Sequence, residues 1–124
     1  MELPSKRYAD AVAVCPAGRL DHATAEGFKR ALGPHLARCT RGGDRVVLDL
    51  ARVEYISSVG LRVLMLASKQ AKAQGGTLAV AALQPVVREI FEISRFNLVL
   101  EVFPTLREAL AKLSPAALAA FEAT

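Results

Sequence analysis

Short apolar runs separated by turn residues predict the strands of a β-sheet. Residues 45–50 (RVVLDL) are nearly all apolar, which is typical of a strand buried on both faces of a sheet. Alternation within residues 7–20 (RYADAVAVCPAGRL) predicts an opening strand or hairpin. Two later apolar runs predict further strands at residues 77–83 and 97–103.

Apolar residues at helical spacing follow the opening strand. Asp21 or Thr24 is placed to cap a helix predicted within residues 21–39, and Pro34 predicts a kink near its end. Four apolar residues recur at i, i+3, i+7 and i+11 on one face of this helix: Ala25, Phe28, Leu32 and Leu36.

A second helix is predicted from Val59 to the glycine pair at 75–76. Two more are predicted over residues 85–93 and 105–113, followed by a short Ala-rich helical tail over residues 114–124. The face of the second helix that we expect to pack on the sheet consists of Leu61, Leu64, Met65 and Ser68.

Strands that alternate with helices indicate an α/β protein with crossover connections. A chain of 124 residues buries about two-thirds of its unfolded surface, so its core is stable without disulfide bonds or a bound metal. The hydrophobic content of 52% fits a packed globular protein. We therefore expect one domain over residues 1–113, with residues 114–124 as its tail.

The formal net charge is +4, but the basic residues are scattered along the sequence rather than clustered. Aromatic residues are sparse, and there is no tryptophan. A nucleic-acid-binding protein usually shows a basic stripe with stacking residues, so we expect no direct contact with nucleic acid. A weak attraction to acidic partners remains open.

The N-terminal segment does not predict a signal peptide, because its charges extend into the middle of a short apolar stretch. No apolar run approaches the ~20 residues of a membrane span, so we expect no membrane insertion. These features favour a cytoplasmic protein in which Cys15 and Cys39 are reduced thiols. Two isolated cysteines without a nearby pair of histidines make a poor metal site, and we expect no metal.

Two adjacent serines, Ser57 and Ser58, lie where a strand-like run meets the second predicted helix. A helix N-terminus exposes unpaired N–H groups and carries a partial positive charge. A serine there is a good N-cap, and a phosphate there is electrostatically tolerated. Capping is the ordinary explanation for either hydroxyl.

A serine hydrolase is the enzymatic alternative for Ser58. Its strained turn requires small residues on both sides of the nucleophile; Gly60 supplies one, but Ile56 occupies the other position. His22 and His35 are the only histidines that could serve as the base. The sequence has no phosphate-binding loop and no dinucleotide-binding glycine motif, so we expect neither an enzyme nor a cofactor.

Several short motifs follow one another in a fixed order between Tyr8 and Leu113. Residues 18–32 (GRLDHATAEGFKRAL) come first, and an apolar strand with Leu-Asp-Leu comes next. A Ser-x-Gly-Leu junction, a helix ending in Gly-Gly, and Phe-Pro-Thr before a last helix complete the series. This order resembles the STAS domain of bacterial anti-sigma factor antagonists. The resemblance implies the STAS fold, a mixed central β-sheet with about four to five helices, mostly packed on one face.

The resemblance also implies a partner-switching regulator. In that family, an anti-sigma factor that is itself a serine kinase phosphorylates a serine two residues before Gly-Leu, which is Ser58 in this chain. The unphosphorylated antagonist binds the kinase, the phosphorylated form is released, and a PP2C-type phosphatase removes the phosphate. Relatives often have aspartate directly before the acceptor, where this chain has Ser57, so Ser57 is the alternative acceptor.

A partner-binding surface is expected around the serine pair. Asp21 matches a position that commonly contributes to the kinase-binding surface, although an N-cap is its alternative role. Arg62 lies one helical turn beyond Ser58 and either pairs with its phosphate or is a solvated side chain. The predicted surface consists of Asp21, Ser57, Ser58, Val59, Gly60 and Arg62. We expect a monomer or weak dimer.

The alternative function is a non-switching STAS module, such as the small cytosolic subunit of a lipid-transport ABC complex. Such a subunit would hold its transporter through the same helix face without phosphorylation. An acceptor-like Ser58 favours the switch, but a serine that caps a helix suits either function.

Overall fold

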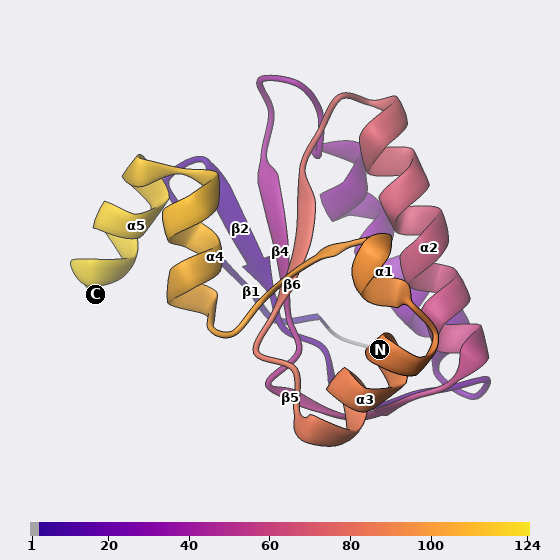
Figure 1. Ribbon diagram of the computed structural model, residues 1–124. Helices are drawn as coiled ribbons and strands as arrows, with labels where there is room; N and C mark the ends of the chain where they lie inside the picture. The colour runs from indigo at the N-terminus through magenta and orange to yellow at the C-terminus, as the bar shows by residue number, and fades with distance from the viewer. Residues whose placement is uncertain (1–2) are drawn as a thin grey trace.

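Five short strands form a mixed sheet at the centre of the molecule (Figure 1). The structure is a computed structural model that describes residues 3–124. The strands lie in the order β1-β2-β4-β6-β7; β1 is antiparallel to β2, and the other neighbours are parallel. Their bounds are β1 Ser5–Tyr8, β2 Ala11–Val14, β4 Arg45–Asp49, β6 Leu78–Ala81 and β7 Glu101–Phe103.

Two further strands, β3 (Ala17–Leu20) and β5 (Arg52–Ile56), pair in parallel as a separate small sheet. In this register Leu20 lies opposite Ile56, so the two strands end together. Both ends therefore meet beside the start of the next helix, where the serine pair lies.

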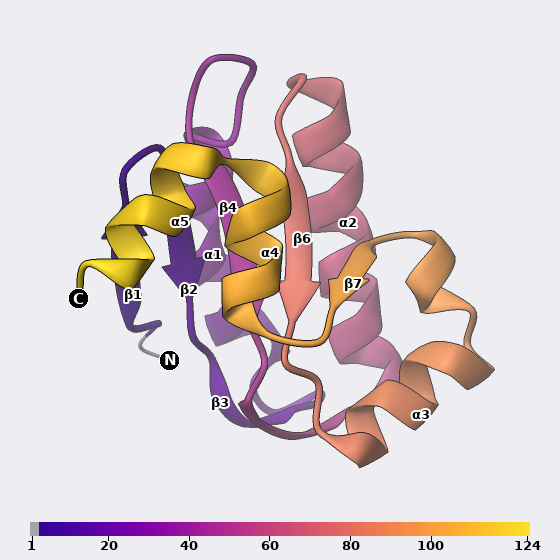
Figure 2. The same ribbon diagram turned by 60° about the vertical axis from the view of Figure 1, so that its left-hand side comes forward.

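Helices cover both faces of the five-stranded sheet (Figure 2). Three of them contribute to the core on one face, and the other two contribute to the core on the opposite face. This arrangement agrees with the expected mixed sheet and its four to five helices, mostly on one face. Among residues 3–124, no helix has the length and apolar character needed to cross a bilayer. The first group is α1 (Ala25–Ala37), α2 (Ser58–Ala73) and α3 (Pro85–Ile93); the second is α4 (Leu106–Leu113) and α5 (Pro115–Glu122).

The nearly all-apolar strands have different side-chain sizes on their two faces. In β4, Val46 and Leu48 join the core beneath α1, α2 and α3, whereas Val47 joins the core beneath α4 and α5. Strands β2 and β6 place larger residues on the first face and alanine on the second. Small residues on the second face leave room for α4 to pack against the sheet. The residues are Val12, Val14, Leu78 and Val80 on the first face, and Ala11, Ala13, Ala79 and Ala81 on the second.

The predicted buried face of α1 is confirmed, because all four of its apolar residues are at most 7% exposed. The helix also continues past Pro34 to Ala37. The predicted face of α2 is wrong at Met65, which is 38% exposed. Since α2 is apolar on more than one side, periodicity alone did not select the side that packs on the sheet. Its buried residues are Gly60, Val63, Leu64, Ala67, Ser68 and Ala71.

The run at residues 97–103, predicted as one strand, is divided in the structure. A short 3₁₀ helix, η1 (Phe96–Leu98), precedes β7. Phe96 is buried and packs against Phe91 of α3, with 5.3 Å between the ring centroids. This aromatic contact fixes the residue directly before the run against α3, and only the last three residues of the run pair in the sheet.

A carboxylate in the β1–β2 turn fastens α5 to the rest of the fold. The Ser114 hydroxyl donates to Asp10 Oδ1 at 2.5 Å, and Arg45 Nη1 donates to Asp10 Oδ2 at 2.6 Å. Ser114 Oγ also accepts the N–H of Ala117 and thereby caps α5. The hydrogen bond from Ser114 is the main cause that lowers the pKa of Asp10.

We predict that Ser114→Ala lowers the free energy of unfolding by about 1–2 kcal/mol at neutral pH, because both the cap and the bond to Asp10 are lost. The pKa of Asp10 is lower in the folded chain than in the unfolded chain. The share of the lost stability that is due to the Asp10 carboxylate therefore disappears as the pH falls through that lowered pKa. Denaturant unfolding of wild type and variant at neutral and strongly acidic pH measures both effects. A difference between the two proteins that grows with acidity would contradict this account.

Candidate functional site

The serine pair lies where β5 ends and α2 begins. Ser57 has extended backbone geometry and is the N-cap of α2, and its Oγ accepts the N–H of Gly60 at 3.3 Å. Ser58 is the first residue of the helix, one position earlier than predicted, and is exposed. Capping, the ordinary explanation for either serine, therefore belongs to Ser57.

The junction is held against the end of β3 by one backbone carbonyl. The N–H of Ser57 donates to the carbonyl oxygen of Leu20 at 2.9 Å. A Cβ atom on Gly60 would lie 2.5 Å from that oxygen and 2.9 Å from the Ile56 side chain. Only glycine fits here, since real Cβ atoms do not approach backbone oxygen so closely. The lack of a side chain at Gly60 thus allows α2 to lie close to β3.

Asp21 directly follows Leu20, so the same contact brings it to the serine end of the molecule. Its Oδ1 accepts the N–H of Ala23 at 3.0 Å, and its Oδ2 accepts Arg19 Nε at 3.4 Å. Partial burial raises the pKa of Asp21, but hydrogen bonds from Ala23, Arg19 and Thr24 and the charge of His22 together leave the pKa below its usual value. Asp21 is therefore a charged group at this edge.

Of the two residues expected to cap α1, Asp21 accepts the N–H of Ala23 through its side chain and the N–H of Ala25 through its carbonyl, whereas Thr24 does not cap the helix with its side chain. Thr24 occupies the N-cap position, but its side chain makes no cap hydrogen bond. Its hydroxyl instead donates to the carbonyl oxygen of Arg19 at 2.8 Å and accepts the N–H of Asp21 at 3.0 Å. Thr24 thus fixes the loop between β3 and α1, because its hydroxyl ties the α1 end of the loop to Arg19 and Asp21 at the β3 end.

Sequence reasoning did not identify the contact between Arg19 and Tyr55. The Arg19 guanidinium lies over the Tyr55 ring, 4.4 Å from its centroid. The two residues face each other in the register of β3 and β5. No local pattern marks such a pair, because it follows from the pairing of two strands distant in the sequence.

The first turn of α2 has unused hydrogen-bond donors. Of its early N–H groups, Ser57 donates to Leu20 and Gly60 donates to Ser57 Oγ. Within residues 3–124, the N–H groups of Ser58 and Val59 have no backbone acceptor. No acidic residue lies in this turn. A negative group attached to Ser58 would meet these donors and the positive end of the helix dipole.

Two of the other predicted surface residues, Val59 and Arg62, line one hollow between α1 and α2. This hollow has a volume of about 260 Å³ and is also lined by His22, Glu26 and Lys29. Val59 is 42% exposed, as expected for an apolar residue left off the sheet side. The predicted surface residues thus lie on one end of the molecule, except that Gly60 is buried beneath it.

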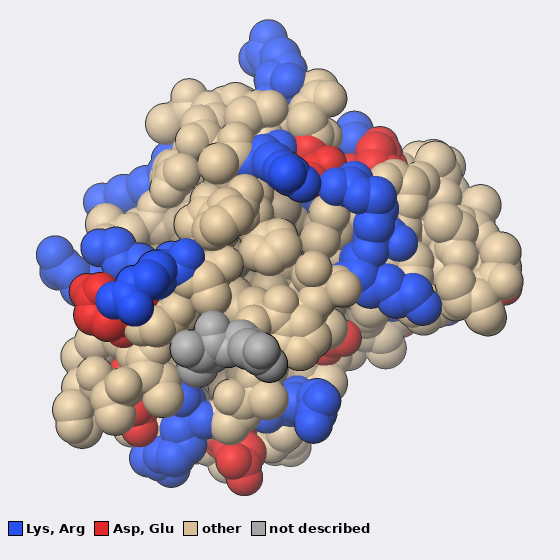
Figure 3. Space-filling model, turned by 180° about the vertical axis from the view of Figure 1, so that it is seen from behind, with Lys and Arg blue, Asp and Glu red and all other residues tan. Residues whose placement is uncertain are grey.

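On the face seen in Figure 3, basic side chains gather in several clusters, one of them an elongated blue band, and red acidic groups stand beside some of them. Within residues 3–124, no group of three or more His, Cys, Asp or Glu side chains could hold a metal ion, and both cysteines are free.

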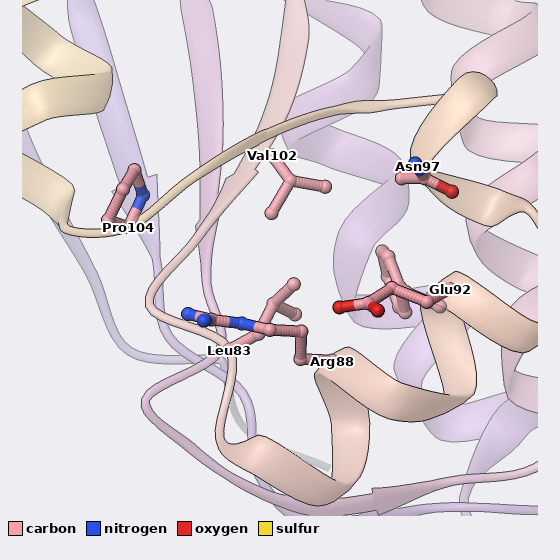
Figure 4. A pocket seen from close by; sticks show the side chains of 7 residues that line it. Leu83, Arg88, Glu92, Asn97, Val102 and Pro104 are labelled. Carbon is pink, nitrogen blue, oxygen red and sulfur yellow. The ribbon is translucent and has the colours of Figure 1, made fainter.

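A larger cavity of about 520 Å³ lies away from the serine pair, between α3 and β7 (Figure 4). Arg88 and Glu92 project from α3 at its edge, and Asn97 of η1 faces them. None of the predicted surface residues lines this cavity. It is therefore separate from the candidate site at the start of α2.

The fold and the serine junction together define a STAS domain, and the STAS domain family matches residues 3–109. The chain belongs to this family. BtrV of Bordetella bronchiseptica, which is named as an anti-sigma factor antagonist, is 41% identical over 104 residues that cover 84% of each chain. The resemblance inferred from the order of motifs is confirmed.

Solved structures share the fold at lower sequence identity. An anti-sigma factor antagonist from Thermotoga maritima is similar with a TM-score of 0.80 and 24% identity, over 90% of this chain and 93% of that one. SpoIIAA from Bacillus, described in its phosphorylated form, is similar with a TM-score of 0.65 and 17% identity, over 90% and 99% of the two chains. At these identities the comparison shows the fold alone.

The close approach at Gly60 leads to a prediction with a matched control. We expect Gly60→Ala to lower the free energy of unfolding by about 1–3 kcal/mol, because the new methyl group overpacks the Leu20 carbonyl. In α1, a Cβ on Gly33 would meet nothing within 4 Å apart from its chain neighbours. The gain in helix propensity is offset by crowding against Pro34, so Gly33→Ala should change the free energy of unfolding by less than about 1 kcal/mol. Urea unfolding of both variants measures the difference, and a Gly60→Ala protein as stable as wild type would refute the packing argument.

Proposed function

We propose that this protein is an anti-sigma factor antagonist that binds an anti-sigma factor serine kinase when unphosphorylated and is released by phosphorylation at Ser58. A PP2C-type phosphatase returns it to the binding form. The observation that carries the proposal is the division of the serine pair. Ser57 caps α2, and Ser58 is exposed at the same helix end with its hydroxyl uncommitted to the fold. The name of the relative from Bordetella bronchiseptica supports the antagonist role.

Release by phosphorylation follows from charge rather than refolding. A phosphate adds about −1.5 to −2 charges at one point of the surface. At the start of α2 the free N–H groups and the helix dipole stabilise this charge, so the modified chain stays folded. A kinase surface docked over Ser58 would have to desolvate the same charge, which weakens the complex.

Arg62 supports the phosphorylated state in this proposal. It is exposed one turn beyond Ser58 on α2 and forms no ion pair with another described residue. An arginine at this spacing reaches a phosphate on Ser58 and pairs with it through two parallel hydrogen bonds. The pair competes with any contact that Arg62 makes to the partner.

We expect the chain, incubated with ATP and its genome-neighbour kinase, to gain one phosphate at Ser58, mapped by mass spectrometry. Ser58→Ala should abolish the label. Ser57→Asp is the matched control, because aspartate retains the N-cap and removes the neighbouring hydroxyl. In that variant the label should remain on Ser58.

Ser58→Asp should weaken kinase binding by roughly tenfold or more, the scale expected for a charge at a desolvated contact, while the melting temperature stays nearly unchanged. A label on Ser57, or none with any cognate kinase, would reject the proposed switch. The second outcome favours the non-switching subunit of a transport complex. Unfolding of Ser58→Asp would show instead that Ser58 is structural.

A further inference from the structure

A groove runs between α1 and α2, starting at the serine end of the molecule. It consists of the hollow of about 260 Å³ at His22 and a second of about 150 Å³ that extends to Gln70. The two hollows are continuous, because Lys29, Val63 and Leu66 line both of them. From Val59 to Gln70 the groove follows about 17 Å of helix. We call this surface the α1–α2 groove.

Apolar side chains in this groove remain accessible to solvent. Leu66 is 43% exposed and lies in the middle of the groove, and Val59 is 42% exposed at its beginning. Buried Leu32 and Leu36 of α1 complete the apolar lining of the second hollow. An apolar surface of this shape and length fits three turns of a helix laid along it.

Gly33 keeps the α1–α2 groove open. It lies in the interior of α1 and lines the second hollow, where a Cβ atom would meet nothing within 4 Å. Its φ is not positive, unlike those of Gly18, Gly42 and Gly75. Glycine lowers helix stability relative to alanine, but here it also avoids the clash that a Cβ directly before Pro34 would make in a helix. The open space over Gly33 admits the close approach of another molecule.

The charge of the two helices indicates what that molecule carries. Of the sixteen basic and twelve acidic residues in the chain, α1 and α2 hold five basic residues and one acidic residue. The remainder holds eleven of each, so the whole positive excess belongs to these two helices. The positive charge of α1 and α2 therefore favours a partner that carries acidic side chains. The five basic residues are Lys29, Arg30, Arg62, Lys69 and Lys72, and the acidic one is Glu26.

We infer that the α1–α2 groove binds an amphipathic helix of the anti-sigma factor kinase, one that carries acidic residues beside an apolar stripe. This inference rests on the proposed function and extends its contact surface beyond Ser58. The groove begins at Val59 and Arg62, so the same partner reaches both surfaces. Leu66 enters the apolar stripe of that helix, its backbone approaches Gly33, and Lys29 and Arg62 pair with its acidic side chains.

The test measures binding of the purified kinase to the unphosphorylated full-length chain by calorimetry, without ATP. Gly33→Leu fills the groove, and Leu66→Glu places a like charge within it. Each should weaken binding by roughly tenfold, as expected on losing a central contact. Met65→Glu is the matched control for Leu66, because Met65 is similarly exposed but does not line the groove. It should bind within about twofold of wild type, an effect typical of a contact outside the binding centre.

Charge and folding are controlled separately. Lys29→Glu should weaken binding more than Arg30→Glu, which makes the same charge change at a residue that does not line the groove. A melting temperature for Gly33→Leu close to that of wild type excludes unfolding as the cause. Wild-type affinity in both Gly33→Leu and Leu66→Glu would overturn the inference and leave the proposed function standing.

Two other results would also contradict the inference that the α1–α2 groove binds a helix of the kinase. If Gly33→Leu instead dissociates a dimer of the free chain in sedimentation experiments, the groove binds a second copy and the inference is wrong. If the wild-type chain binds no candidate kinase, the proposed function fails first, and this inference fails with it.

Discussion

The carbonyl oxygen of Leu20 holds the functional end of this protein together. It accepts the N–H of Ser57 at 2.9 Å, and α2 passes so near to it that residue 60 has no room for a side chain. This contact joins the end of β3 to the start of α2, although nearly forty residues separate them in the sequence. Asp21, the serine pair and the beginning of the α1–α2 groove lie together because of it.

The two neighbouring hydroxyls at this junction differ in role because of their backbone positions. Ser57 has extended geometry, so its side chain turns toward the first N–H groups of α2 and accepts one of them. Ser58 already belongs to the helix and is exposed. A fold held through Leu20, Ser57 and Gly60 does not depend on Ser58. Such a position can take up a charge while the surrounding structure stays unchanged, as the proposed switch requires.

The sequence predicted the parts of the fold that depend on local spacing. Apolar residues at helical intervals identified the buried face of α1, since Phe28 and Leu32 lie one turn apart and have no competing apolar face. The same method misplaced Met65, because α2 has apolar residues on several sides and only the tertiary contacts decide which side is buried. It also missed η1, where the contact of Phe96 with Phe91 outweighs strand propensity.

Contacts between distant segments were beyond prediction from a single sequence. The serine junction was identified by the order of motifs around it, but the reason for Gly60 appears only when β3 and β5 are paired. The same holds for the hydroxyl of Thr24, which bonds to Arg19 instead of capping α1. The α1–α2 groove was likewise hidden, because Gly33 is an ordinary glycine until its open surroundings and the neighbouring Leu66 are known.

The different roles of Ser57 and Ser58 are tested by comparing the stabilities of their two alanine variants. Denaturant unfolding of Ser57→Ala and Ser58→Ala, each measured against wild type under the same conditions, gives the contribution of each hydroxyl to folding. We expect Ser57→Ala to lose about 1 kcal/mol of stability, the value of an N-cap, and Ser58→Ala to be as stable as wild type. Equal losses in the two variants, or a loss confined to Ser58→Ala, would contradict this assignment of roles.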